Sequence, residues 1–129
     1  HRATETTRVA SLKKSLAEGI TADLTDVIET VPSSCAVVPG IAHLCIAGVE
    51  SEALLFLLDE ANVCASAASA CASGAMETSH VLRAMGVEPR FAKGALRLSL
   101  GHTTTQEDVD RAIEVVVASV QRLRAHRPQ

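Results

Sequence analysis

The sequence predicts a small α+β fold, a two-layer sandwich in which short strands carry helices packed on one face. A helical pattern opens the chain, a second one closes it, and short apolar or alternating segments bounded by turn residues lie between them. At 129 residues, the chain has the length of one domain with a core of its own. Aromatic residues make up only 2% of it, so aliphatic side chains must build that core.

Residues 4–28 follow a helical pattern, because apolar residues recur along them at spacings of three and four. Gly19 interrupts the pattern, so we expect two helices joined near residues 19–22. Residues 29–34 include a proline and two serines and predict a loop. The residues that define the apolar helical face are Val9, Leu12, Leu16 and Ile20.

The middle of the chain predicts strands around a short helix. Residues 41–48 are apolar and bounded by turns, which indicates a buried strand. Ser51 is placed to cap a helix whose leucine-rich face spans residues 53–60. Residues 62–65 are a candidate for a second short strand.

The last part of the chain predicts two helices and a strand. Thr78 or Ser79 caps a helix that runs through Met85. Leucines alternate with polar residues over 95–100, which indicates a half-buried strand. Residues 104–107 have the spacing of a capping box and start the final helix. One face of that helix carries Val109, Ile113, Val116, Val117, Val120 and Leu123.

Charge and hydropathy exclude several classes of partner. The net charge of −3 argues against nucleic acid and against anionic lipid. The apolar stretches fall far short of the ~20 residues that span a membrane. No secretory leader is visible, and the chain opens at His1, so we interpret it as a fragment or a processed product.

The four cysteines, at positions 35, 45, 64 and 71, favour reduced thiols in the cytoplasm. No pair has the C-x-x-C spacing, which argues against a structural zinc site and a thioredoxin motif, and we expect no metal. Cys35, Cys45 and Cys64 adjoin apolar segments and are expected to be buried. Cys71 differs, because small residues surround it over 66–78; it is either a reactive thiol or part of an ordinary surface loop.

Arg97 is the second candidate site residue, because it points away from the leucines of its predicted strand. A guanidinium there could hold a carboxylate in a bidentate pair. The alternative is an arginine on the surface of a strand, in contact with solvent.

Three motifs, in register, resemble the pyridoxal-phosphate-dependent cysteine desulfurases, which are class V aminotransferase-like enzymes of fold type I. S-A-C-A-S-G at 69–74, followed by S-H-V-L-R-A-M-G at 79–86, is similar to the cysteine-loop region of that family. L-R-L-S-L-G at 96–101 and the acidic stretch after it look like the next motif. G-V-E-S-E-A-L-L at 48–55 resembles an upstream segment. The match runs from about residue 39 to residue 123.

The resemblance implies a role for each candidate residue. Cys71 would attack the sulfur of the substrate L-cysteine, become a persulfide as alanine leaves, and pass the sulfur to an acceptor protein. Arg97 would grip the substrate carboxylate. Three positions depart from the family pattern: His43, where Asn is frequent, Ala68, where Gly is frequent, and Thr103, where Phe is frequent.

The resemblance also implies a larger enzyme, of which residues 1–129 are the C-terminal small domain. The lysine that holds pyridoxal phosphate belongs to a large domain, and Lys13, Lys14 and Lys93 do not have its sequence context. We therefore expect no cofactor in this chain and no activity from it alone, whereas the full-length enzyme would bind pyridoxal phosphate and form a homodimer. Iron–sulfur cluster assembly, tRNA thiolation and cofactor biosynthesis are all open as the destination of the sulfur.

Two other functions are compatible with the sequence. One is a stand-alone thiol carrier, or a module that docks a partner. The other is a related enzyme of the same fold, a selenocysteine lyase or an aminotransferase. Cys71 within its segment of small residues favours sulfur transfer over transamination.

Overall fold

The computed structural model describes residues 2–29, 40–63, 65–67 and 86–126. The helix expected from Thr78 or Ser79 to Met85 lies outside this part of the chain. The elements in chain order are α1 (Arg2–Asp23), β1 (Val27–Glu29), β2 (Ile41–Ile46), α2 (Ser51–Glu60), β3 (Ala65–Ala67), α4 (Pro89–Ala92), β4 (Ala95–Ser99) and α5 (Gln106–Ala125).

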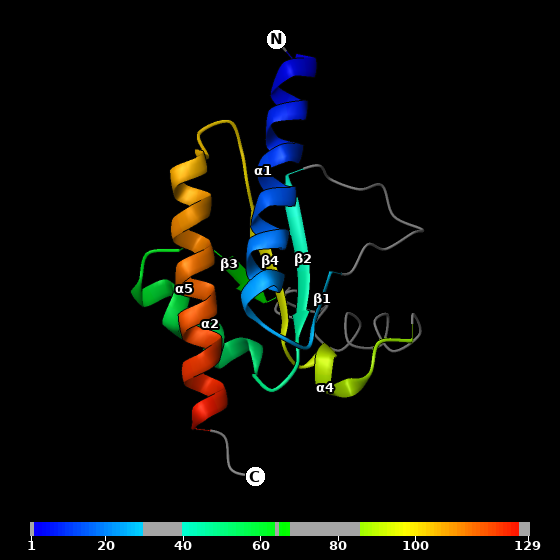
Figure 1. Ribbon diagram of the computed structural model, residues 1–129, viewed down its shortest axis with the longest axis vertical. Helices are drawn as coiled ribbons and strands as arrows, with labels where there is room; N and C mark the ends of the chain where they lie inside the picture. The colour runs from blue at the N-terminus through cyan, green and yellow to red at the C-terminus, as the bar shows by residue number, and fades with distance from the viewer. Residues whose placement is uncertain (1, 30–39, 64, 68–85, 127–129) are drawn as a thin grey trace.

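The strands form one antiparallel sheet in the order β1-β2-β4-β3. The two longest strands, β2 and β4, therefore lie at its centre. Helices α1, α2 and α5 pack together over one face of the sheet (Figure 1). The predicted two-layer α+β fold is confirmed. The short helix α4, which the sequence patterns did not indicate, packs near one end of β2.

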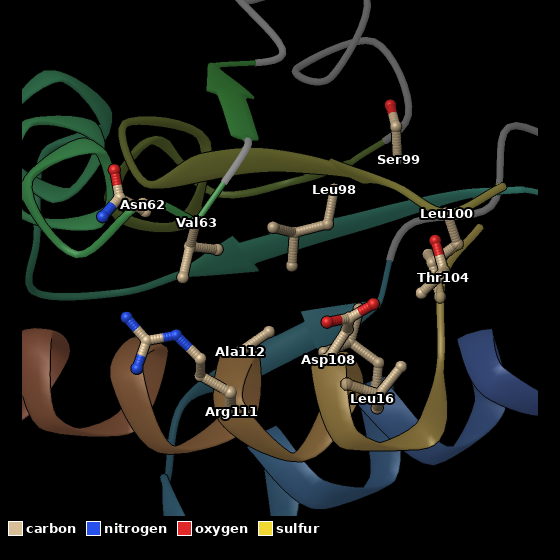
Figure 2. Close-up of a pocket in the computed structure, with 11 residues that line it drawn as sticks. Leu16, Asn62, Val63, Leu98, Ser99, Leu100, Thr104, Asp108, Arg111 and Ala112 are labelled. Atoms are coloured by element: carbon tan, nitrogen blue, oxygen red, sulfur yellow. The ribbon is translucent and has the colours of Figure 1, made fainter.

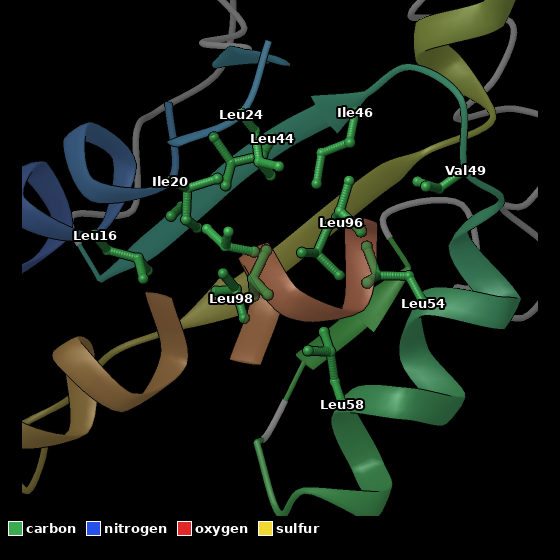
Figure 3. Close-up of a cluster of buried hydrophobic side chains, with 14 of the residues drawn as sticks. Leu16, Ile20, Leu24, Leu44, Ile46, Val49, Leu54, Leu58, Leu96 and Leu98 are labelled. Carbon is green, nitrogen blue, oxygen red and sulfur yellow. The ribbon is translucent and has the colours of Figure 1, made fainter. Parts of the chain in front are cut away.

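The core between the sheet and the three long helices is aliphatic. Leu44 and Ile46 of β2 and Leu96 and Leu98 of β4 point into it (Figure 3). The leucine alternation predicted for residues 95–100 is thus confirmed. The helices contribute the buried residues Leu12, Leu16, Ile20, Leu54, Leu58, Val109, Val116, Val117 and Val120.

The predicted break near Gly19 is wrong, because α1 continues through it to Asp23. Gly19 faces α5, where a Cβ atom would overlap the side chain of Ile113. The missing side chain therefore allows two helices to approach closely rather than ending one of them. The chain reverses after α1 at Asp26, whose φ is 55°, and β1 replaces the expected end of the helical pattern and start of the loop.

The predicted helix starts at Ser51 and at residues 104–107 need correction. Ser51 is the first residue of α2, and its hydroxyl donates to the carbonyls of Lys93 and Ala95 instead of capping the helix. The capping box of α5 is shifted by one residue, because the side chain of Thr105 accepts from the Asp108 amide and that of Asp108 accepts from the Thr105 amide.

The short strand expected at residues 62–65 is also displaced. Asn62 lies in the turn after α2 with φ at 62°, and strand β3 covers Ala65–Ala67 instead. Its position is set by pairing with β4, where Ala65 lies opposite Leu98.

Gly94 provides a test of the packing at the start of β4. Its carbonyl accepts from the Ile46 amide at 3.1 Å, and a Cβ atom would overlap the Ile46 carbonyl oxygen. We expect Gly94→Ala to lower the free energy of unfolding by about 1–3 kcal/mol, because backbone atoms would have to move apart. Gly101→Ala is the control, since a Cβ atom there meets no atom within 4 Å. Urea unfolding of both variants measures the difference, and equal stabilities would contradict the close approach.

Candidate functional site

The candidate site lies on the face of the sheet opposite the aliphatic core. Side chains alternate along a strand, so His43 and Cys45 of β2 point to this outer face while Leu44 and Ile46 point to the core. Arg97 of β4 lies directly opposite His43 in the β2–β4 register. Arg97 therefore occupies the middle of the outer face, on the side that the sequence predicted, and it is half-buried.

Helix α4 closes one end of this outer face. Phe91 and Ala92 pack against Cys45, Ala47 and Ala95, and all five are buried. Cys45 is 1% exposed, which confirms the prediction that it is a core residue. The outer face is thus apolar and closed beside α4, and polar at His43 and Arg97.

The electrostatics of the outer face favour an anion. Burial lowers the pKa of His43, and the positive charges of Arg97 and Lys13 lower it further. His43 therefore favours its neutral form near neutral pH. An anion bound at Arg97 would relieve the positive potential at this place.

Strand β4, which carries Arg97, is anchored at both ends by hydrogen bonds from side chains of elements that are distant in the sequence. At its start, the Ser51 hydroxyl donates to the Lys93 and Ala95 carbonyls at 2.8 and 2.7 Å. After its end, the Arg8 guanidinium of α1 donates to the carbonyls of Gly101, His102 and Thr104. These contacts anchor the backbone of β4, the strand that carries Arg97, to α1 and α2.

The other predicted site residue, Cys71, lies outside the described residues, as do Cys35 and Cys64, so its role stays a prediction. His43 was noted in the sequence only as a departure from a family pattern, and its place beside Arg97 was missed. A signal was present: His43 is the polar residue in the middle of an apolar strand segment. The register that brings it to Arg97 could not be read from that segment.

A cavity of about 270 Å³ lies elsewhere, between the end of β4 and the first turns of α5 (Figure 2). Its walls are mostly apolar, and Arg97 does not line it. Two of its polar residues serve the fold, because Arg111 donates to the Ala61 carbonyl and Asp108 belongs to the capping box of α5. These two charged residues of the cavity are thus engaged in structural hydrogen bonds.

The lysines of the chain do not form a site for pyridoxal phosphate. Lys13 is half-buried on α1, whereas Lys14 on the same helix and Lys93 beside α4 are exposed. A lysine that holds an aldehyde cofactor needs a sheltered pocket with further polar partners, and none of the three lysines is buried. Within residues 2–29, 40–63, 65–67 and 86–126, no cluster of metal-ligating side chains occurs, and no helix is long and apolar enough to cross a membrane.

Comparison with known proteins identifies the family. The family model for aminotransferase class-V matches residues 2–112. The chain belongs to the aminotransferase class-V family. The predicted resemblance to cysteine desulfurases is confirmed by relatives with that name. An IscS-like cysteine desulfurase of Mycobacterium tuberculosis is 44% identical over 117 residues, which are 91% of this chain and 30% of the relative.

Further relatives agree. Cysteine desulfurase IscS of Anaeromyxobacter sp. is 39% identical over 98% of this chain and 30% of its own length. A solved NifS-like protein from Rickettsia africae superposes with a TM-score of 0.72 at 26% identity, over 92% of this chain and 29% of that chain. This class-V chain thus spans about a third of the length of the relatives it matches.

His43 gives the class-V chain a pH-dependent contribution to stability. Its pKa is lowered from the ordinary 6.5 in the folded state, so folding favours the neutral imidazole. That contribution is present above pH 6.5 and is lost as the pH falls through the lowered pKa, because protonation then favours the unfolded chain. We expect His43→Asn to lose less stability than the unmodified chain between pH 7.5 and pH 5.

Urea unfolding at several pH values measures this difference. His102→Asn is the matched control, because His102 is exposed in the loop after β4. It should keep the pH profile of the unmodified chain. The assignment fails if His43→Asn and the unmodified chain lose the same stability over this range.

Proposed function

We propose that this chain is the C-terminal small domain of a cysteine desulfurase. In this proposal, Cys71 takes the sulfur of L-cysteine as a persulfide, the rest of the substrate leaves as L-alanine, and Arg97 binds the substrate carboxylate. The observation that carries the proposal is the position of Arg97, half-buried at the centre of the outer sheet face in a chain of the class-V family.

Arg97 suits the carboxylate for electrostatic and geometric reasons. A guanidinium presents parallel N–H donors that match the two oxygens of a carboxylate. Its strand is central in the sheet and is anchored at both ends by hydrogen bonds from Ser51 and Arg8, so the backbone that carries the guanidinium is fixed. The charges that act on neighbouring His43 are both positive.

Cys71 suits the nucleophile because a thiol that carries sulfur must reach both the substrate and an acceptor. Its neighbours in the sequence are alanine, serine and glycine, all of which have small side chains. A thiolate is the reactive form of such a nucleophile. Family membership and the cysteine desulfurase names of the relatives support this role.

The remaining machinery is proposed to lie in a large domain that this chain does not include. That domain would hold pyridoxal phosphate, which supplies the electron sink for the chemistry at the amino acid, and it would mediate a homodimer. The protein would act in the cytoplasm and deliver sulfur to an acceptor protein, with iron–sulfur cluster assembly as one destination. The isolated chain would neither bind the cofactor stably nor release sulfide from cysteine.

Replacing Cys71 tests the nucleophile. In the full-length enzyme, we expect Cys71→Ala to abolish sulfide release from L-cysteine while the cofactor absorbance near 400 nm persists, since only the sulfur acceptor is removed. Cys45→Ala is the matched control, because Cys45 is buried in the sheet, and it should retain sulfide release. The 129-residue chain alone should show neither signal. Normal sulfide release by Cys71→Ala would exclude this role.

Replacing Arg97 tests the carboxylate contact. We expect Arg97→Ala to raise KM for L-cysteine and to cost about 2–4 kcal/mol in kcat/KM, because a charge pair is broken in a partly buried place. Arg122→Ala on the exposed side of α5 is the control and should leave both constants near those of the unmodified enzyme. Steady-state kinetics decide, and an unchanged KM in Arg97→Ala would remove Arg97 from the substrate site.

A further inference from the structure

The cross-strand neighbour of Arg97 extends the site beyond one arginine. His43 and Arg97 are directly opposite each other in the antiparallel β2–β4 pair. Side chains of opposed residues lie on the same face with their Cβ atoms about 4.5–5.5 Å apart. A carboxylate held by the Arg97 fork would therefore lie within the electrostatic reach of the imidazole.

We propose that His43 is a second binding residue of the Arg97 carboxylate site, and that protonated His43 strengthens the binding of the anion. This inference rests on the proposed role of Arg97. In this inference, the affinity of the site for an anionic substrate group increases as the pH falls and His43 becomes protonated.

The charges of the described residues that act on His43 are positive. Arg97 acts from β4 and Lys13 from α1, and both disfavour the imidazolium. On β2 itself, the neighbours on the outer face are Ile41 and buried Cys45. Glu29, the last residue of β1, is opposite Leu44 and so belongs to the other face of the sheet.

Helix α4, which packs near the end of β2, adds little net charge. It carries Arg90, and the preceding Glu88 pairs with that guanidinium at 3.3 Å, where both side chains are exposed. No carboxylate among the described residues acts on His43. Among the charges of the described residues, a bound carboxylate would add a negative one to the positive ones that act on the imidazole.

Proton binding at His43 and anion binding at Arg97 are thermodynamically linked, so each must favour the other. An anion at Arg97 favours the imidazolium, so binding raises the pKa of His43 from its lowered value. By reciprocity, protonation of His43 must raise the affinity for the anion by the same factor. For two partly exposed groups this close, we expect a factor of roughly threefold to tenfold.

The test measures equilibrium binding of L-alanine to the full-length protein between pH 5.5 and pH 7.5. Over this range the carboxylate of L-alanine stays ionised and its amino group stays protonated, so its own charge does not change. We compare the unmodified protein with His43→Asn and His43→Gln. Two different substitutions are used so that a folding defect in one of them does not prevent the test. His102→Asn is the control for removal of a histidine.

We expect binding to tighten roughly threefold to tenfold more at low pH in the unmodified protein and in His102→Asn than in either His43 variant. Nuclear magnetic resonance of ¹³C-labelled histidine should show the His43 pKa rising when L-alanine is added. This second readout does not depend on turnover.

Two outcomes separate this inference from the proposed function. If both His43 variants keep the full pH dependence and Arg97→Ala weakens L-alanine binding, the role of His43 is overturned and that of Arg97 stands. If Arg97→Ala binds L-alanine as the unmodified protein does, the carboxylate role of Arg97 fails and the role of His43 fails with it.

Discussion

The antiparallel pairing of β2 and β4 is the constraint on which the rest of the structure depends. Successive side chains on a strand point to opposite faces, so the strand register determines both which residues enter the core and which lie on the outer face. Leu96 and Leu98 enter the aliphatic core because Arg97 between them points outward, opposite His43. A slip by one residue would bury the guanidinium and expose the leucines. Burial of the core therefore fixes the site.

Contacts distant in sequence hold this central pair in place. Ser51 joins the start of α2 to the backbone at the start of β4, and Arg8 joins α1 to the loop after β4. The near absence of aromatic residues makes such anchoring more important. A core of leucine, isoleucine and valine has few large rings to lock its geometry, and directional hydrogen bonds to backbone carbonyls add specificity.

In the proposed chemistry, Arg97 binds the substrate from a fixed position and Cys71 carries the sulfur. Arg97 sits on a central strand of a class-V fold, where its position is set by the sheet. Cys71 belongs to a segment of small residues, which suits a thiol that has to meet both a substrate and an acceptor. The chain spans about a third of its relatives, so the cofactor chemistry is proposed to come from the remaining two-thirds.

The sequence by itself determined the features that depend on local periodicity: the aliphatic faces of the first and last helices, the leucine alternation of β4 and the outward direction of Arg97. Tertiary structure alone decided the sheet order, the continuity of α1 through Gly19, the inward hydrogen bonds of Ser51 and the meeting of His43 with Arg97. A side-chain period is set by the geometry of one element. Pairing and close approach are set by the free energy of burying surfaces that are far apart in the chain.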